Sequence, residues 1–190
     1  FSGTTFSGCS PDNNRTLTRQ AHRAMQTAAR YFRSEVSCNG GYLYKYTTDF
    51  TMMEGEEIAT PTRGWLEPPG TPAVGMAYME AYNATGDTLF LNCAIETAHG
   101  LAWGQLASGG WYEYVDFDPV ESRKFHCRRD IEKGDTITGK RRNHSTLDDN
   151  KTQSALQLLM QVDKALDFKD ADIHRSALYG LDALLGVQYS

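Results

Sequence analysis

Apolar side chains recur every three or four residues in five stretches of the chain, which is the spacing of residues on one face of an α-helix. The stretches predict helices over residues 15–36, 71–85, 88–106, 150–166 and 170–188. Thr71-Pro72 strengthens the second of them, because a capping residue followed by proline is typical of a helix start. Residues 146–150 likewise combine the polar residues that begin helices.

Two Gly-Gly turns, each followed by alternating aromatic residues, form an internal repeat. Each alternation predicts a short strand. The sequences are Gly40-Gly41-Tyr42-Leu43-Tyr44 and Gly109-Gly110-Trp111-Tyr112-Glu113-Tyr114. The helical pair over residues 71–105 also aligns with the pair over residues 152–188, and each pair ends in a glutamine.

Repeated helical hairpins bury their apolar faces only by stacking on neighbours, and about three units are needed for stability. We therefore expect an all-α fold, a single domain over residues 1–190 built as an arc of antiparallel hairpins. Short β excursions follow the Gly-Gly turns, and residues 118–145 form a charged loop insertion. An apolar face predicts that the chain is part of an assembly, covered by another chain or by a continuation beyond Ser190. That face carries Leu178, Leu181, Leu184 and Leu185.

The charge of the chain excludes a general attraction to nucleic acids. The 190 residues are 40% hydrophobic and 23% charged, with a formal net charge of -5. Nucleic-acid binding favours a basic face instead. No stretch reaches the roughly 20 apolar residues that span a bilayer. A protein partner or a locally bound anion remains compatible with this composition.

Four N-x-Ser/Thr sequons predict a secreted, extracellular glycoprotein, because average Ser and Thr usage makes only about one asparagine in seven a sequon by chance. The sequons start at Asn14, Asn83, Asn143 and Asn150. The first residue is Phe1, which is consistent with a mature chain whose signal peptide has been removed.

Four cysteines fit two disulfides in an oxidising compartment. We predict a Cys38–Cys127 bond because the Gly-rich turns of the two repeats are expected to share one side of the fold, and this leaves Cys9 to pair with Cys93. Three connectivities remain open on sequence alone. Cys93 lies within a helical pattern, so the alternative is that it serves as a small buried hydrophobic residue.

Three passages resemble the pectate lyases of polysaccharide lyase family 10. They are Pro68-Pro69-Gly70-Thr71-Pro72-Ala73, Ser108-Gly109-Gly110-Trp111 and Thr146-Leu147-Asp148-Asp149-Asn150-Lys151-Thr152. They look like successive hairpin starts of that family's α/α toroid. The resemblance runs from about residue 21 to residue 188 and implies an incomplete toroid, the N-terminal part of the family's catalytic domain.

The resemblance implies β-elimination of polygalacturonate, a reaction that calcium and cationic side chains assist. It places Asp148 and Asp149 at the calcium or substrate end of the cleft, since adjacent carboxylates suit a hard cation. The alternative role of these two residues is helix capping. The family's catalytic arginine belongs to a part of the domain that this sequence does not contain, so no base is assigned.

Aromatic and basic residues supply further candidates for substrate binding. Trp65 and Trp111 suit stacking on sugar rings, although both positions also suit the core of a helical fold. Arg63 is a third candidate. The basic residues between Arg123 and Arg142 either hold an anionic sugar chain or form a solvated loop diluted by interleaved acidic residues.

Two classes of function follow. The first is a secreted glycoprotein that binds or cleaves an acidic polysaccharide such as polygalacturonate, with calcium as the implied cofactor. The second is a non-catalytic structural glycoprotein of an extracellular matrix or filament, which a glycan on Asn150 beside the implied active loop favours.

Overall fold

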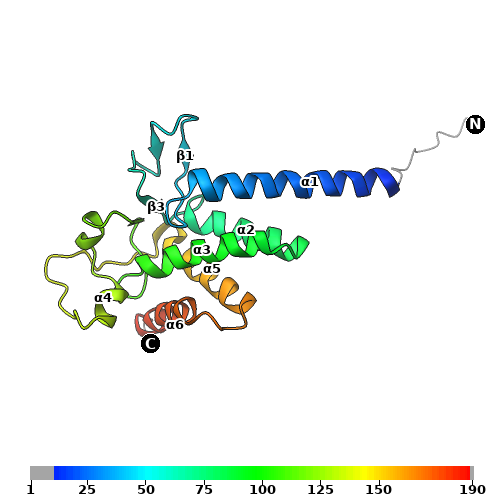
Figure 1. Cartoon of the computed structure of the whole chain (residues 1–190). Helices are drawn as coiled ribbons and strands as arrows, with labels where there is room; N and C mark the ends of the chain where they lie inside the picture. Colours follow the sequence, from blue (N-terminus) through cyan, green and yellow to red (C-terminus); the bar gives the residue numbers. More distant parts are fainter. Residues whose placement is uncertain (1–10, 189–190) are drawn as a thin grey trace, which may run out of the picture.

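The computed structural model describes residues 11–188, and side chains from residue 14 onwards. The chain is mostly helical, as predicted. Helix α1 (Pro11–Tyr31) continues into a π-helical turn, η1 (Phe32–Val36), and projects beyond the rest of the molecule (Figure 1). It is attached by both polar and apolar contacts: His22 and Gln26 bind Asp87 Oδ2, at 3.0 and 2.7 Å, and Ala29 is buried in the main core. The predicted helix over residues 15–36 is therefore confirmed, with an earlier start.

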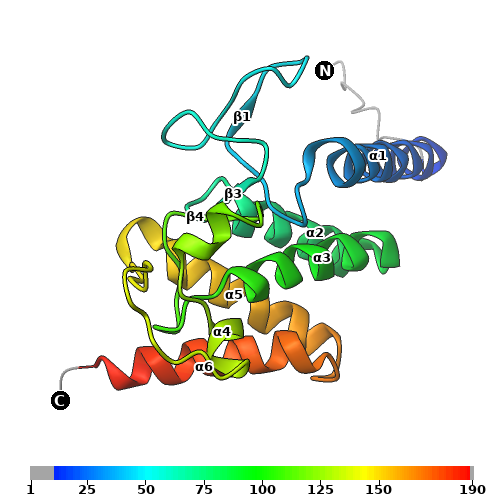
Figure 2. The ribbon, with the colours of Figure 1, turned by 60° about the vertical axis from the view of Figure 1, so that its left-hand side comes forward.

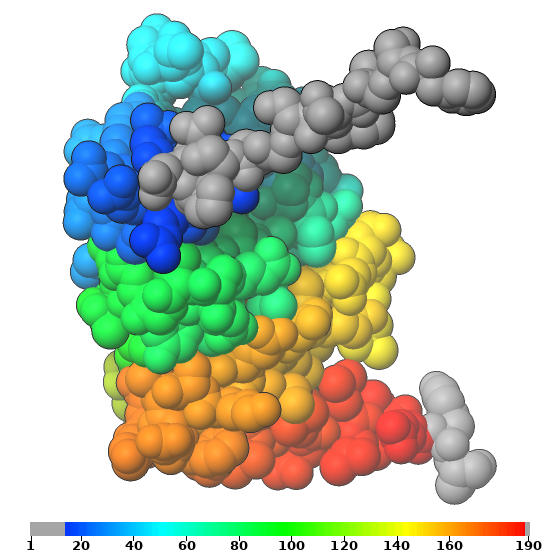
Figure 3. Space-filling model, turned by 90° about the vertical axis from the view of Figure 1, so that its right-hand side faces the viewer, coloured from blue at the N-terminus to red at the C-terminus, as the bar shows by residue number. Residues whose placement is uncertain are grey.

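Two helical hairpins make up the body of the molecule. The first is α2 (Thr71–Thr85) with α3 (Thr88–Gly104), and the second is α5 (Lys151–Ala165) with α6 (Ala171–Gly186). Both helices of the first hairpin contact α5, and α3 also contacts α6. Figures 2 and 3 show the resulting order, from α1 through the first hairpin to α6. All four predicted hairpin helices are confirmed to within a few residues.

The internal repeat is visible in the hydrogen bonds of the two Gly-Gly turns. The amide of Tyr42 donates to Thr71 Oγ1 at 2.9 Å, and the amide of Trp111 donates to Thr152 Oγ1 at 3.2 Å. Each threonine stands in the first turn of the hairpin that follows its Gly-Gly turn. The two halves of the chain therefore fix the same turn onto the same helix start.

Glycine is required in these turns by close packing against the second helix of each hairpin. Gly40 has φ +81°, and a Cβ atom there would lie 2.2 Å from the carbonyl oxygen of Glu96 in α3. Gly109 has φ +97°, and its Cβ would lie 2.2 Å from Ala183 Cβ in α6. Left-handed backbone and contact at this distance exclude any side chain.

Four short strands lie at one end of the hairpins. β1 (Lys45–Tyr46) pairs antiparallel with β2 (Met53–Glu54), and β3 (Arg63–Trp65) pairs antiparallel with β4 (Tyr114–Asp116). β1 and β4 confirm the strands predicted after the Gly-Gly turns. β3 was not among the predicted elements, and its pairing with β4 joins the two repeats.

Residues 118–145 fold onto the body through buried residues. The segment contains a 3-10 turn, η2 (Glu121–Lys124), and a short helix, α4 (Arg128–Glu132). His126 is 1% exposed, and its ring binds Thr138 Oγ1 and the carbonyl oxygen of Asp135, both at 2.9 Å. Arg128, whose side chain is 4% exposed, pairs with Asp172 of α6 at 2.8 Å. These contacts give the charged segment a defined shape.

The cysteines in the described part of the chain are all free. The predicted Cys38–Cys127 bond is therefore wrong. The backbone of Cys38 forms an isolated β-bridge with Gly41 after η1, whereas the backbone of Cys127 forms one with Leu106 before α4. Cys93 is 1% exposed within α3, as expected of a small hydrophobic residue. Cys9, its predicted partner, lies outside the described residues.

The outer face of α6 is open, unlike the corresponding face of α3. Leu178 is 49% exposed and Leu185 is 65% exposed, and both lie in the apolar face expected from the sequence. In the repeat, Leu185 corresponds to Ala102 of α3, which is 1% exposed because α3 is covered by the second hairpin. None of the helices in residues 11–188 is long and apolar enough to cross a membrane.

Candidate functional site

Three carboxylates and one lysine meet where the first strands approach the start of α5. Glu56, Glu67 and Asp149 each place a carboxylate oxygen within 4.8 Å of the others. Lys151 Nζ lies 3.2 Å from Asp149, 3.4 Å from Glu67 and 4.0 Å from Glu56. The Lys151 side chain is only 5% exposed. We call these four residues the acidic cluster.

The backbone at the start of α5 brings Asp149 into this cluster. Asp149 and Asn150 have φ values of 50° and 60°, in the 3-10 turn η3 (Asp148–Asn150). Aspartate and asparagine tolerate left-handed backbone better than most residues. The turn directs Asp149 toward Lys151, whereas Asp148 is exposed and not part of the cluster.

Excess negative charge shapes the protonation of the cluster. Burial and the neighbouring Glu67 carboxylate raise the pKa of Glu56 above its usual range. Burial lowers the pKa of Lys151, but hydrogen bonding to Asp149 and the charges of both glutamates outweigh it, so that its pKa is raised overall. Lys151 therefore stays charged at neutral pH, and it neutralises only one of the three carboxylates.

A basic pocket of about 730 Å³ lies between strand β4, η2 and residues 138–144. We call it the basic pocket; its cationic and aromatic lining residues are Arg63, Lys124, Lys140, Arg142, Tyr114 and Phe125. Two of its guanidinium groups lie over tyrosine rings, Arg63 over Tyr114 at 4.1 Å and Arg142 over Tyr112 at 3.9 Å. Stacking on aromatic rings fixes such groups while their N–H donors stay free to bind.

The basic pocket and the acidic cluster are neighbours. The Trp65 ring lies between Tyr114 of the pocket, at 5.4 Å, and Tyr44, at 6.1 Å. Arg63 of the pocket also lies 3.6 Å from Glu57, the residue that follows Glu56 of the cluster. Residues 143–149 also lead along the chain from one site to the other. Positive and negative groups thus occupy adjoining parts of one surface.

The structure corrects two of the predicted substrate-binding residues. Trp65 is 1% exposed and Trp111 is 0% exposed, so neither offers a ring face to a sugar. Trp111 Nε1 donates to the carbonyl oxygen of Leu101 inside the main core. Both residues hold the hairpins and strands together, as the alternative interpretation expected.

Arg63 lines the basic pocket, but its charge is partly used within the protein. Its Nε lies 3.1 Å from Asp116 Oδ2, and the Asp116 side chain is 1% exposed. Arg142 is exposed and stacked, and it has no acidic partner among the described residues. Among the pocket's arginines, Arg142 is therefore better placed than Arg63 to bind an external anion.

Three of the sequon asparagines, Asn14, Asn83 and Asn150, are exposed. The fourth, Asn143, is half-buried at the edge of the basic pocket, and its Oδ1 accepts from the amide of Ser108 at 2.7 Å.

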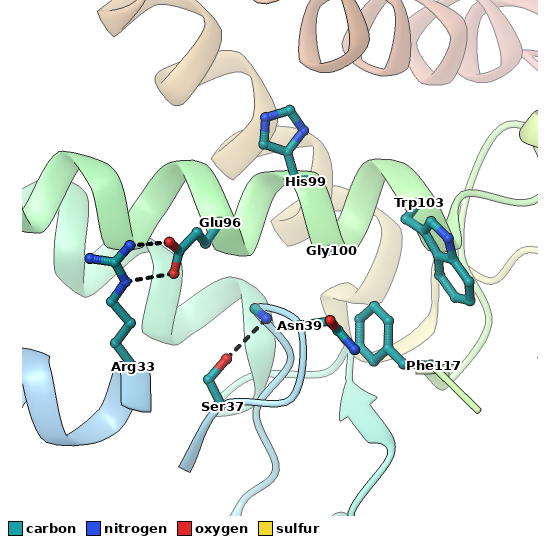
Figure 4. A pocket seen from close by; sticks show the side chains of 9 residues that line it. Arg33, Ser37, Asn39, Glu96, His99, Gly100, Trp103 and Phe117 are labelled. Carbon is teal, nitrogen blue, oxygen red and sulfur yellow. Dashed lines mark hydrogen bonds and ion pairs between the residues drawn. The ribbon is translucent and has the colours of Figure 1, made fainter. Parts of the chain in front are cut away.

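A separate hollow of about 610 Å³ lies between η1, the first Gly-Gly turn and α3 (Figure 4). An ion pair joins Arg33 to Glu96, and these two side chains point toward one another. His99, which also lines the hollow, lies 3.0 Å from Asp170. Trp103 and Phe117 close its other end, stacked at 5.2 Å. Because the ion pair is internal and the rings face each other, this hollow presents no uncompensated charge or free ring face.

Comparisons with known proteins place the chain by its fold. No protein-family model matches it, and no curated protein resembles it significantly in sequence. The family 10 polysaccharide lyase from Cellvibrio cellulosa is similar in structure, with a TM-score of 0.53 and 19% identity over 95% of this chain and 53% of that one. A mutant of that lyase in complex with trigalacturonic acid gives a TM-score of 0.51 and 20% identity, over 94% and 51% of the two chains.

This likeness shows a distant structural relation to family 10 polysaccharide lyases, and it supports the resemblance at the level of the fold. The chain spans about half the length of these two structures.

Sequence reasoning missed three residues that the structure brings into the site: Glu56, Glu67 and Lys151. Glu56 belongs to an acidic run over residues 54–57, and Lys151 stands inside the fourth sequon. No periodicity links these segments, because the contacts depend on how the strands approach α5.

Proposed function

We propose that this chain binds acidic polysaccharide such as polygalacturonate, at the basic pocket and the adjoining acidic cluster. The observation that carries the proposal is the basic pocket itself, which gathers four cationic side chains and a single carboxylate, Glu121, on a chain with net charge -5. A supporting observation comes from the structural relative, a polysaccharide lyase whose mutant was solved in complex with trigalacturonic acid.

The lining of the basic pocket suits a uronate. The planar guanidinium of Arg142 can donate two parallel hydrogen bonds to a carboxylate, and Lys140 adds charge beside it. The charge of Lys124 is offset by Glu121, which lies 2.6 Å away. The Arg142 guanidinium stacks on the Tyr112 ring, with its Cζ 3.9 Å from the ring centre, so the side chain loses little conformational freedom when it binds a ligand. The pocket volume lies within the usual range for ligand sites.

We extend the proposal to calcium at the acidic cluster, where the donor set fits. The carboxylate oxygens of Glu56, Glu67 and Asp149 lie close enough to share one ion, and calcium prefers oxygen ligands. Lys151 offsets only part of their charge, which favours a further cation. Asp148 stands one residue away and is exposed, so it would complete such a site through solvent. Calcium held there would supply positive charge that attracts a uronate carboxylate.

Cleavage by β-elimination is a separate extension of this proposal, because it requires a base. The raised pKa of Lys151 keeps it protonated and unsuited to that role. Release of unsaturated uronides, followed by ultraviolet absorbance with and without calcium, decides between binding and cleavage.

Exposure of Asn150 supports the second candidate function, a secreted structural glycoprotein. Asn150 directly follows Asp149, so a glycan on it would stand at the acidic cluster. Mass spectrometry of peptides from the natural source distinguishes the two candidates. A fully occupied Asn150 favours the structural role, and an unmodified Asn150 favours polysaccharide binding.

We also propose that a further helical hairpin, of this or another chain, covers the open face of α6 and extends the stack toward a toroid. The exposed Leu185 stands where the first hairpin has the buried Ala102. Light scattering tests this: self-association that Leu185→Gln abolishes supports cover by a second copy, whereas a monodisperse monomer requires a different cover.

The test of polysaccharide binding is calorimetric titration with polygalacturonate. We expect the double variant Lys140→Ala/Arg142→Ala to lose affinity at least about tenfold, since one hydrogen bond to a charged group contributes about 1.5–3 kcal/mol. The control variant is Arg19→Ala/Arg23→Ala, which removes the same charge from the exposed face of α1. Equal losses in both variants would reduce the proposal to nonspecific charge attraction.

A further inference from the structure

A second pocket with cationic walls lies beside the basic pocket, and the two share Phe125. It has a volume of about 430 Å³. We call it the flank pocket; its charged and aromatic lining residues are Trp103, Arg123, Phe125, Arg129, Asp130, Lys133 and Arg141. It contains four cationic side chains and one carboxylate.

The backbone explains why neighbouring basic residues enter different pockets. The amide of Arg142 donates to the carbonyl oxygen of Lys124 at 2.7 Å, and Phe125 and Arg142 form a bridge. Lys140 belongs to a turn in which the amide of Arg141 donates to the carbonyl oxygen of Thr138 at 3.1 Å. Around this turn Lys140 and Arg142 line the basic pocket, while Arg141 lines the flank pocket.

Two of the four cations in the flank pocket are already engaged. Arg129 lies 3.7 Å from the centre of the Trp103 ring and donates to the Trp103 carbonyl oxygen. Arg141 pairs with Asp135 at 2.9 Å and lies 3.5 Å from Asp130. These contacts hold both guanidinium groups in place at the wall of the pocket.

The other two, Arg123 and Lys133, are exposed, and their side chains have no partner within residues 14–188. Like charges gathered without counter-charges repel each other, and a bound anion relieves that repulsion. The single lining carboxylate, Asp130, is shared with Arg141 and with the amide of Cys127. The flank pocket therefore keeps a net positive charge.

We propose that the flank pocket binds a second uronate segment of the same acidic polysaccharide chain that occupies the basic pocket. This inference rests on the proposed function. Because the pockets meet at Phe125, a long chain held in one of them keeps a high local concentration of carboxylates at the other. Short oligosaccharides occupy the basic pocket alone, and long chains gain affinity from both.

The experiment compares two variants and two lengths of ligand by calorimetry. Arg123→Ala/Lys133→Ala removes the two unpaired cations of the flank pocket, and Lys140→Ala/Arg142→Ala removes two of the four cations of the basic pocket. We expect the flank variant to bind polygalacturonate at least fivefold more weakly and trigalacturonate unchanged. We expect the basic-pocket variant to weaken both ligands. The replaced Arg123 and Lys133 side chains are exposed and unpaired, so the fold is retained.

A local readout accompanies the titrations, because Trp103 borders the flank pocket while Trp65 and Trp111 are buried. We expect saturating polygalacturonate to shift the Trp103 indole signal in NMR spectra of the wild type, but not of the flank variant. If the flank variant matches the wild type in both measurements while the basic-pocket variant loses affinity, the inference is wrong and the proposed function stands. If the wild type binds neither ligand, the proposed function itself fails.

Discussion

Lys151 is the residue on which the acidic cluster depends, and its replacement gives the sharpest test of the site. Substitution by methionine keeps the length and apolar stem of the side chain and removes the ammonium group. In the wild type the Lys151 ammonium lies 3.2 to 4.0 Å from the carboxylates of Glu56, Glu67 and Asp149. In the variant these three carboxylates face each other without a cation between them. We expect the Lys151→Met variant to fold with clearly reduced stability.

The magnitude follows from charge and burial. Two unit charges 4 Å apart near a protein surface attract by about 4 kcal/mol, but burying the ammonium offsets much of this gain. Removing one partner of a buried ion pair typically costs about 3–5 kcal/mol. Glu56 and Asp149 are 47% and 49% exposed, and solvent screens exposed pairs. We therefore expect a loss of about 2–3 kcal/mol at pH 7.

The assay is urea unfolding followed by circular dichroism, with Lys169→Met as the matched control. Lys169 also lies 3.2 Å from a carboxylate, that of Asp167, but the two side chains are 78% and 79% exposed. The control variant should lose less than about 0.5 kcal/mol. The comparison isolates the burial of Lys151, since the charge removed and the nearest ion-pair distance are the same.

The dependence on pH has a definite sign. Glu56 already has a pKa raised by burial and by Glu67, and loss of Lys151 raises it further, so the variant gains stability as falling pH protonates the cluster. The difference between wild type and Lys151→Met should therefore shrink between pH 7 and pH 4. A difference that is equal to that of the control, or that grows toward acidic pH, would refute this account of the cluster.

Three further predictions concern the fold. Gly109→Ala should destabilise the protein by about 3 kcal/mol in thermal or urea unfolding, because the backbone is strained and the new Cβ overlaps Ala183. The control Gly134→Ala, at φ +87° in open space, should lose about 1–2 kcal/mol from backbone strain alone, and equal losses in the two variants would contradict the packing at Gly109. Trp111→Phe should lower the melting temperature and leave polygalacturonate affinity unchanged, and weaker binding by a stable variant would return Trp111 to the binding site. Burial raises the pKa of Cys127 to about 11 and also raises the pKa values of Cys38 and Cys93. These three free thiols should therefore react slowly with a thiol reagent in the native protein at pH 8 and fully after unfolding without reductant, and a disulfide between two of them in peptide mass spectrometry would contradict the structure.

The helices and the repeat could be predicted from the sequence because their causes are local. Helical spacing and the Thr71-Pro72 start set the hairpins within a few residues of their observed bounds. The Gly-Gly turns carry the repeat because close packing leaves no room for a side chain at Gly40 or Gly109. Such constraints act on neighbours in the chain, so they leave a pattern in it.

The site was predicted less well because its contacts join distant segments. Asp149 lies in the acidic cluster and Arg63 in the basic pocket, whereas Asp148 points elsewhere. The role of aromatic residues after the turns depended on burial, which spacing alone does not determine. The charges of residues 123–142 appear mixed along the chain. They separate in the folded chain, where Lys140 and Arg142 line one pocket and Arg141 lines the other.

The central claim is that the surface recognises the carboxylates of an acidic polysaccharide. The most direct measurement is calorimetric titration of the chain with polygalacturonate and with the same polymer after methyl esterification. Esterification keeps the sugar backbone and removes the charge that Lys140 and Arg142 would bind. The account predicts saturable binding of the free acid and little or none of the ester. Equal affinity for both polymers, or no binding of the acid, would contradict it.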